Sequence, residues 1–339
     1  MSEELLTIEE SEAGTAVRRT VRRRTRDVFY GVVLYLFMFT ALQYVLYAEY
    51  GLLAALMGGV LPEKPSDFFY GVIILISTAA ALTMGWLYFA GKAERGALFK
   101  GPAVTREILA RRERLPFISL LGCIGLVFLL QIMFSFVIEA FELLFNRFGY
   151  TLQYSEAMNA DYATSWTLLV YAVLIGPLAE EIMYRGFLMR GLEPNGRAFA
   201  LVTSAFVFGM MHGDFQQTMF TMAVGLLFAY VAMRYSLWYA LALHIFNNGI
   251  LGELWVWMIG RMTDEVYVIV IAVLLILSVI GTVVLFRRHG KEAFSWLSED
   301  ETKPGAWKSL INFWFVLFLV FSVTEIVYSI SPMQEDKGL

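Results

Sequence analysis

Residues 165–186 read SWTLLVYAVLIGPLAEEIMYRG, and this stretch determines how the rest of the chain must be read. Its first part, 165–178, is almost entirely apolar, and Glu180, Glu181 and Arg185 follow directly. A charged side chain at bilayer depth costs roughly 2.5–3.5 kcal/mol on insertion scales. Three such charges in one apolar segment therefore indicate mutual pairing and a functional role.

The composition is that of a membrane protein. Of the 339 residues, 58% are hydrophobic and 17% are charged, whereas soluble domains carry about 25% charged residues. One soluble core cannot bury so much apolar surface, so we expect an integral, multi-pass membrane protein. The single cysteine, Cys123, excludes an intrachain disulfide and a CxxC or zinc-finger site.

Nine apolar segments can be read along the chain, at about 28–48, 68–91, 116–138, 165–189, 198–213, 217–233, 237–258, 266–286 and 309–331. Turn and charge signals separate them, such as Pro194-Asn195-Gly196. We therefore predict an all-α fold, a polytopic transmembrane helical bundle of about 8–9 spans. The fifth and sixth segments are short and could form one broken helix pair around Gly213.

The segments divide the chain into four parts. Residues 1–27 form an acidic and then arginine-rich tail, 28–162 hold the N-terminal helices, 163–258 hold the candidate catalytic core, and 259–339 hold the C-terminal helices and tail. The apolar run at 28–48 is longer than the 7–15-residue core of a signal peptide. It is therefore predicted to span the membrane rather than to be cleaved.

The basic residues orient the chain. With the N-terminus in the cytosol, nearly all of the 26 Lys and Arg residues fall on the cytosolic side, and the exceptions are Lys64, Arg147, Arg261 and Lys337. Cytosolic loops of membrane proteins carry such an excess. The arginines within 18–26 directly precede a membrane helix, which favours contact with membrane lipid over binding of nucleic acid.

Polar side chains recur deep in the central segments. Glu181 and Arg185 are one helical turn apart, which favours an ion pair, and Glu180 is offset by about 100° toward a different neighbour. His244 and Asn248 are also one turn apart and are expected to share a helix face. A third element, His212, ends the fifth segment.

Each of these elements also has a purely structural interpretation. The Glu–Arg pair could be an intramembrane ion pair, His212 could cap a helix, and the His–Asn pair could join helices by hydrogen bonds. Together they favour a hydrolytic site on three helices. A carboxylate and an imidazole can activate a water molecule, and His and Asn can donate to a developing oxyanion.

Three motifs resemble those of a known family. Glu-Glu-x-x-x-Arg at 180–185, Phe-x-x-x-His at 208–212 and His-x-x-x-Asn at 244–248 occur in the order and approximate separation of the CAAX-processing and bacteriocin-processing (CPBP) intramembrane endopeptidases. The type II CAAX prenyl proteases, called Rce1-like, belong to that family. The resemblance covers about 165–255, and it implies a helical bundle with an intramembrane cavity open to the cytosol and the lipid.

The resemblance further implies peptide hydrolysis by an activated water, without a covalent intermediate. The residues it assigns are Glu180 as general base, His212 as its assistant, His244 and Asn248 as oxyanion donors, and Glu181 with Arg185 as the supporting pair. The substrate would be a membrane-associated peptide, either prenylated as in CAAX proteins or of the leader or pheromone type. The sequence does not choose between these substrates.

No cofactor is expected. The chain contains no His-Glu-x-x-His pattern, and a zinc ion would need a Glu together with His212 and His244. Using His244 as a ligand would also remove it from the oxyanion site. Zinc therefore stands as the alternative to a metal-free mechanism.

Two other functions stay open at this stage. The chain could be a proton-coupled transporter in which Glu180, Glu181 and His212 relay protons. It could also be a catalytically idle membrane protein of the bacteriocin-immunity type that keeps the constellation as a scaffold. Transporters usually show internal repeats, and no repeat is visible in this sequence.

Overall fold

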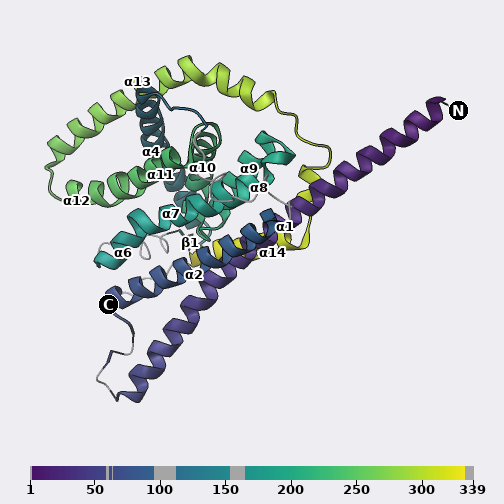
Figure 1. Cartoon of the computed structure of the whole chain (residues 1–339). Coiled ribbons are helices and arrows are strands. Elements are labelled where there is room, and N and C mark those ends of the chain that lie inside the picture. Colours follow the sequence, from purple (N-terminus) through teal and green to yellow (C-terminus); the bar gives the residue numbers. More distant parts are fainter. Residues whose placement is uncertain (1, 59–60, 63, 95–111, 153–164, 333–339) are drawn as a thin grey trace.

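The chain folds almost entirely into helices (Figure 1). The structure is a computed structural model that describes residues 2–58, 61–62, 64–94, 112–152 and 165–332. Within these residues the strands are β1 (Tyr150–Thr151) and β2 (Ser331–Pro332), which pair antiparallel. The predicted all-α membrane class is confirmed.

Each of the nine apolar segments contains a helix. The long helices are α1 (Ser2–Leu56), α2 (Asp67–Glu94), α4 (Phe117–Asn146), α10 (Phe215–Arg234) and α13 (Asp264–Ser298). Together with the helical stretch Trp166–Asn195, they give 6 candidate spans, long and apolar enough to cross a membrane. The remaining helices are shorter: α9 (Arg197–Met210), α14 (Phe313–Tyr328), and the continuous run of α11 (Leu237–Ile245), η5 (Phe246–Leu254) and α12 (Trp255–Ile259).

The N-terminal tail is part of α1 rather than a separate unit. Residues 2–27 are helical and continue directly into the first span. Figure 1 shows this end of α1 projecting beyond the rest of the bundle. The boundary predicted near residues 162 and 163 lies outside the described residues.

Polar caps start the helices where the sequence carries turn signals. The capping side chains accept hydrogen bonds from backbone N–H groups at Ser165 before α6, Asp214 before α10, Ser236 before α11, Thr263 before α13 and Asn312 before α14. Such a cap satisfies an N–H that has no partner within the helix. Between α9 and α10 the chain turns at Gly213, whose φ of 63° favours glycine. The predicted break at Gly213 is therefore present.

Helices α4 and α13 approach closely because small residues lie between them. A Cβ at Gly122 would lie 2.9 Å from the carbonyl oxygen of Gly281, and one at Gly125 would lie 2.9 Å from that of Ser278. Small residues are the usual device for packing helices in lipid. Much of the remaining apolar surface of α13 is exposed, including Val268, Ile269, Ile276 and Leu277, which suits contact with lipid.

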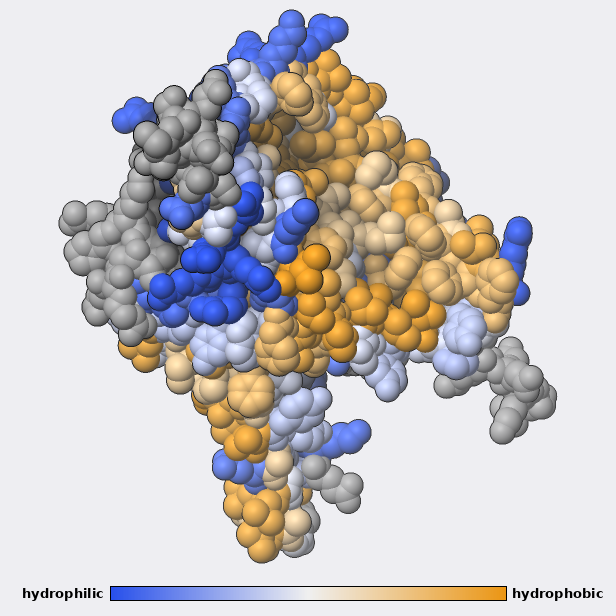
Figure 2. Space-filling model, turned by 90° about the vertical axis from the view of Figure 1, so that its right-hand side faces the viewer, coloured by the Kyte–Doolittle hydropathy of each residue, from blue (hydrophilic) through white to orange (hydrophobic). Residues whose placement is uncertain are grey.

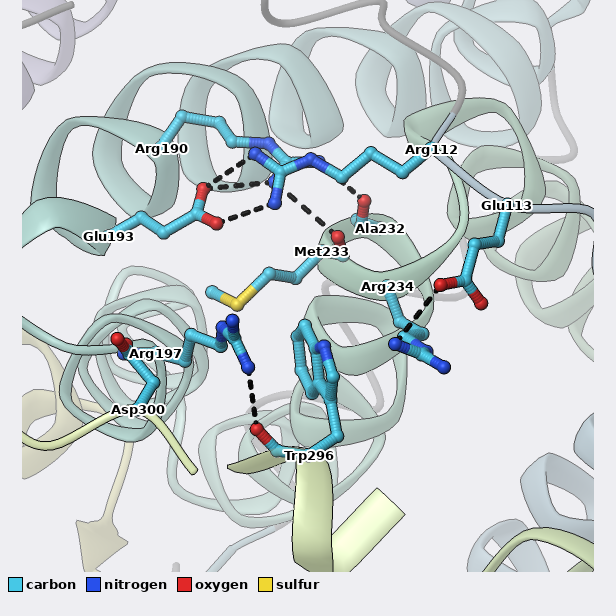
Figure 3. A network of polar contacts seen from close by, with 10 residues as sticks. All are labelled: Arg112, Glu113, Arg190, Glu193, Arg197, Ala232, Met233, Arg234, Trp296 and Asp300. Atoms are coloured by element: carbon cyan, nitrogen blue, oxygen red, sulfur yellow. Dashed lines mark hydrogen bonds and ion pairs between the residues drawn. The ribbon is translucent and has the colours of Figure 1, made fainter. Parts of the chain in front are cut away.

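One end of the bundle carries a network of charged side chains, and we call it the basic end (Figure 3). Arg112 and Arg190 both pair with Glu193, at 2.6 and 3.0 Å. Arg190 also donates to the carbonyl oxygen of Ala232, at 2.8 Å. These contacts join the chain before α4, the end of the Trp166–Asn195 helix and the end of α10.

The same network reaches α13 and α9. Arg234 pairs with Glu113 and Glu292, at 3.1 and 2.8 Å. Arg197, at the start of α9, donates to the carbonyl oxygen of Trp296 at 2.8 Å. Figure 2 looks onto the molecule from this side and shows hydrophilic surface gathered next to broad apolar surface. The basic end therefore has the polarity of a membrane–water boundary.

Candidate active site

The helix that carries the two glutamates has widened turns. It consists of α6 (Trp166–Val170), a π-helical turn η2 (Tyr171–Ile175), α7 (Gly176–Glu180), a π-helical stretch η3 (Glu181–Met189), α8 (Arg190–Leu192) and a 3₁₀ turn η4 (Glu193–Asn195). Pro177 lies inside this helix and lacks the N–H that a regular α-helix would use. Short π-helical stretches are frequent at functional sites because they redirect side chains. Here a π-helical stretch begins at Glu181.

Glu181 and Arg185 form a fully buried ion pair. Arg185 Nη1 lies 3.1 Å from Glu181 Oε1, and both side chains are 0% exposed. The guanidinium carbon lies 3.9 Å from the centre of the Phe208 ring and 5.7 Å from that of Phe228. The contact is an ion pair without an aligned hydrogen bond, since the guanidinium nitrogens make no hydrogen bond to the described residues. The aromatic faces supply further electrostatic stabilisation of the cation.

His244 lies between the two glutamates. Its Nδ1 is 3.0 Å from Glu181 Oε1 and its Nε2 is 3.6 Å from Glu180 Oε2. The ring is buried, with an exposed fraction of 4%, and it packs against Phe208 and Phe228. A carboxylate can only accept, so the contact with Glu181 places the proton on Nδ1. In a neutral ring, Nε2 is then the acceptor nitrogen beside Glu180.

Glu180 differs from Glu181 in its surroundings. Its side chain is 18% exposed, and it lines two cavities that meet at this residue. The larger has a volume of about 650 Å³ and the smaller about 110 Å³. One side of the Glu180 carboxylate therefore faces His244 and the buried Glu181–Arg185 pair, and the other side faces the two cavities.

His212 lies in the turn between α9 and α10. Its Nδ1 is 2.8 Å from the carbonyl oxygen of Phe208, and a carbonyl can only accept, so Nδ1 carries the proton. The neutral ring then has a lone pair on Nε2. His212 lines the large cavity together with Glu180, so an acceptor nitrogen and a carboxylate belong to the same chamber.

Asn248 is held by the neighbouring π-helical turn rather than by His244. Its Nδ2 donates to the carbonyl oxygen of Ala172 at 3.0 Å, and its Oδ1 accepts from Asn247 Nδ2 at 3.0 Å. Asn248 lines the large cavity, whereas His244 is buried behind it. The expected common face is only partly realised, because residues 246–254 are π-helical and the 3.6-residue period does not continue through them.

The large cavity is lined by several acidic and amide side chains. Its charged and amide lining residues are Gln131, Glu180, Asp214, Gln217, Asn247, Asn248, Glu253 and Glu325. Of the described residues that line it, none is Lys or Arg. The cavity therefore presents four carboxyl groups without a fixed positive counter-charge.

The donor set does not fit a zinc site of three protein ligands. Among the residues that the structure describes, no three His, Cys, Asp or Glu side chains lie close enough to hold one ion. His244 is directed at both glutamates, while His212 uses Nδ1 for its own helix. A catalytic zinc normally needs three protein ligands and an open position, and these side chains do not offer that set at one point.

The structure thus gathers the predicted residues around one carboxylate. Glu180, His212 and Asn248 line the cavity, while Glu181, Arg185 and His244 form the buried cluster behind it.

Sequence reasoning missed several cavity residues: Asn247, Asp214, Glu253 and Glu325. It also gave no role to Phe208, whose ring the structure places against Arg185, His212 and His244. Its position in the Phe-x-x-x-His motif was the available signal.

Comparisons with known proteins relate this part of the chain to membrane peptidases. Residues 162–250, which include all three motifs, match the family model described as "Type II CAAX prenyl endopeptidase Rce1-like". The chain is 28% identical over 83 residues to the "Putative membrane peptidase YdiL" of Bacillus subtilis (strain 168). That alignment covers 24% of this chain and 34% of the relative, so the chain spans about a third of the relative's length. No solved structure matches the chain. The predicted family resemblance is confirmed over the matched segment.

Proposed function

We propose that this chain is an intramembrane endopeptidase that hydrolyses a membrane-associated peptide with a water activated by Glu180. The family match over 162–250 supports peptidase activity in general. The observation that carries the mechanism is the position of Glu180, a carboxylate that borders both the buried cluster of Glu181, Arg185 and His244 and the acidic cavity.

Glu180 is the better base of the two glutamates. Glu181 is 0% exposed, and its Oε1 is already shared by Arg185 and His244. That carboxylate is neutralised and cannot reach a water in the cavity. Glu180 keeps access to the cavity, and a carboxylate held within reach of a water can accept its proton in the transition state.

The other residues support this proton transfer. His212 Nε2, the acceptor nitrogen of a neutral ring, can hold or receive a proton of the same water. Asn248 uses one Nδ2 hydrogen for Ala172 and keeps a second for the developing oxyanion. His244 can donate to the oxyanion only as imidazolium, because its neutral form places the proton on Nδ1. An acceptor Nε2 cannot hold the Glu180 carboxylate either. We therefore propose that His244 positions Glu180 and donates to the oxyanion as imidazolium, with Nδ1 donating to Glu181 and Nε2 directed toward Glu180.

The test is a cleavage assay with purified protein in proteoliposomes. Membrane-anchored peptides, with and without a prenyl group, are offered as substrates, and products are identified by mass spectrometry. Cleavage that depends on Glu180 supports the peptidase. Flux of a peptide or of protons without cleavage would instead support the transporter, and neither activity would support the catalytically idle protein.

Metal removal should leave the activity intact. The described donor groups do not assemble a zinc site, so a membrane-permeant chelator is expected to change turnover less than twofold (about 0.4 kcal/mol or less). Elemental analysis of the active protein supplies the independent measurement. One tightly bound zinc per chain, lost in His244→Ala, would reverse the choice in favour of a metalloprotease.

The cavity should favour substrates with positive charge. Its lining includes Glu253 and Glu325 in addition to Glu180, and each solvated charge pair contributes about 0.2–1 kcal/mol. Loss of two such pairs amounts to about 0.4–2 kcal/mol, so the double variant Glu253→Gln/Glu325→Gln is expected to raise KM for a Lys- or Arg-containing peptide about two- to thirtyfold. KM for a neutral peptide should stay unchanged.

Glu301→Gln is the matched control for this charge effect. It makes the same chemical change, with loss of one charge where the cavity variant loses two, at an exposed residue that does not line the cavity. It should leave KM for both peptides unchanged. An equal rise in KM for the basic and the neutral peptide in the cavity variant would contradict the charge preference.

A further inference from the structure

The smaller of the two cavities at Glu180 has a shape and lining of its own, and we call it the small pocket. It has a volume of about 110 Å³ and shares four wall residues with the large cavity: Tyr171, Gly176, Glu180 and Met211. The two spaces therefore meet around the carboxylate that the proposed function makes the base.

Most of the wall of the small pocket comes from helices outside the segment that matches the peptidase family. These wall residues are Tyr35, Leu36, Phe39 and Thr40 on α1, Thr78 on α2 and Phe321 on α14. The three helices pack together, since α1 contacts both α2 and α14 (Figure 1). The family match covers 162–250, so the shape of this pocket is determined mainly by the flanking helices of this chain.

The lining of the small pocket favours an apolar guest. Among the described residues that line it, Glu180 is the only charged one. The Thr78 hydroxyl already donates to the carbonyl oxygen of Ile74, at 2.8 Å. Tyr35 is buried, and its ring stacks on that of Phe39. The wall is therefore mostly hydrocarbon, whereas acidic and amide side chains line the large cavity.

The volume of the small pocket restricts the guest to one side chain. An apolar cavity of about 150 Å³ holds a single benzene molecule. The small pocket, at about 110 Å³, is smaller than that and suits one small aliphatic group. The large cavity, at about 650 Å³, is the space that accommodates the peptide backbone.

We infer that the small pocket is a specificity site that takes one small aliphatic side chain of the substrate peptide, next to the bond that is cut. The inference rests on the proposed function for the position of that bond. Successive Cα atoms lie only about 3.8 Å apart, so a peptide bond held beside Glu180 brings a neighbouring side chain to the junction of the two spaces. The matched segment then supplies the chemistry, and α1, α2 and α14 select the residue.

Photo-crosslinking tests this site without requiring turnover. A neutral, membrane-anchored peptide is scanned one residue at a time with photo-leucine, an aliphatic amino acid that carries a diazirine, against the Glu180→Gln protein. One position should crosslink to residues 35–40 of α1, identified by mass spectrometry after digestion. Thr40→Phe fills the pocket and should lower this crosslink about tenfold or more. Thr83→Phe makes the same change on exposed surface of α2 and should leave the crosslink unchanged.

Cleavage rates of the protein that retains Glu180 supply the second measurement. Peptides that carry Ala, Val or Phe at the crosslinking position are compared. The Val peptide should have a kcat/KM about tenfold or more above that of the Ala peptide. Thr40→Phe should remove this difference by lowering the value for Val alone. Leu36→Ala enlarges the pocket and should raise kcat/KM for the Phe peptide about tenfold.

The outcomes separate the pocket from the proposed activity. Equal losses for the Ala and Val peptides in Thr40→Phe would overturn the inference and assign the pocket to water held beside Glu180. Absence of a crosslink to residues 35–40 from every peptide position would also overturn it. A protein that crosslinks as expected but cleaves no peptide would refute the proposed peptidase and leave the binding site in place.

Discussion

Replacing Glu180 by glutamine is expected to lower kcat by about 10²–10⁴-fold, which is the usual contribution of a proton-transfer catalyst. The substitution keeps the size and shape of the side chain and removes its basicity. Glu180 is 18% exposed and borders the cavity, so the variant should fold and keep its melting temperature. With a neutral peptide, substrate binding should be nearly unchanged, and the loss should therefore appear in turnover of the proteoliposome assay.

Glu253→Gln is the matched control for that experiment. It makes the same chemical change in the same cavity at a residue without a place in the proposed mechanism. With a neutral peptide its kcat should stay within about twofold of the native value. A folded Glu180→Gln protein with near-native turnover would exclude Glu180 as the base, whatever the control shows.

Glu181→Gln should give the reverse pattern, because the two neighbouring glutamates are in different environments. Its charge is buried with Arg185 and contacts His244. Removing that charge leaves a buried guanidinium without its anion, a change that typically costs 3–5 kcal/mol. We therefore expect Glu181→Gln to lower the melting temperature clearly. Glu180→Gln, in contrast, should lower turnover and leave the melting temperature unchanged.

The sequence predicted the parts of the site that local helical geometry determines. The Glu181–Arg185 pair is present because a separation of four residues brings two side chains together on a helix. The end of the fifth helix at Gly213 was also predictable, since Gly213 and Asp214 combine a left-handed turn with a helix cap. The presence of helix in each of the nine apolar segments, within the residues that the structure describes, was predictable from the apolar pattern alone.

The arrangement between helices could not be predicted in this way. His244 and Asn248 were expected to share a face, but the π-helical stretch that begins at Phe246 changes the direction of the later side chains. His244 therefore contacts the glutamates while Asn248 contacts Ala172. No local pattern distinguishes a π-helical from an α-helical stretch in this apolar sequence.

Cavity residues from distant segments were invisible for a related reason. Glu325 lies on α14, outside all three motifs, and reaches the cavity only because α14 packs against the turn at Gly213. Its Cβ lies 2.9 Å from where a Cβ on Gly213 would be. Such a contact depends on tertiary packing, and one sequence contains no periodicity that reports it.

The buried ion pair gives the second large effect, on stability. Arg185→Ala is expected to destabilise the protein more than the double variant Glu181→Ala/Arg185→Ala. Both variants lose the guanidinium that packs against Phe208 and Phe228, so the cost of that cavity is common to them. The single variant alone leaves the Glu181 carboxylate buried without Arg185, which typically costs 3–5 kcal/mol.

The volume effect works against this expectation, which makes the comparison stringent. The double variant removes more buried atoms, since Glu181 is also 0% exposed, and it deprives His244 of its Nδ1 partner. Packing alone would therefore make the double variant the less stable of the two. A higher melting temperature for the double variant, measured in detergent micelles, can then only reflect relief of the unpaired charge.

Arg112→Ala is the control from a solvated pair, since Arg112 is 42% exposed, and it should cost about 1 kcal/mol or less. Equal melting temperatures for Arg185→Ala and the double variant would mean that the pair contributes no such coupling, and Glu181 would then have to be held in the membrane by His244 alone.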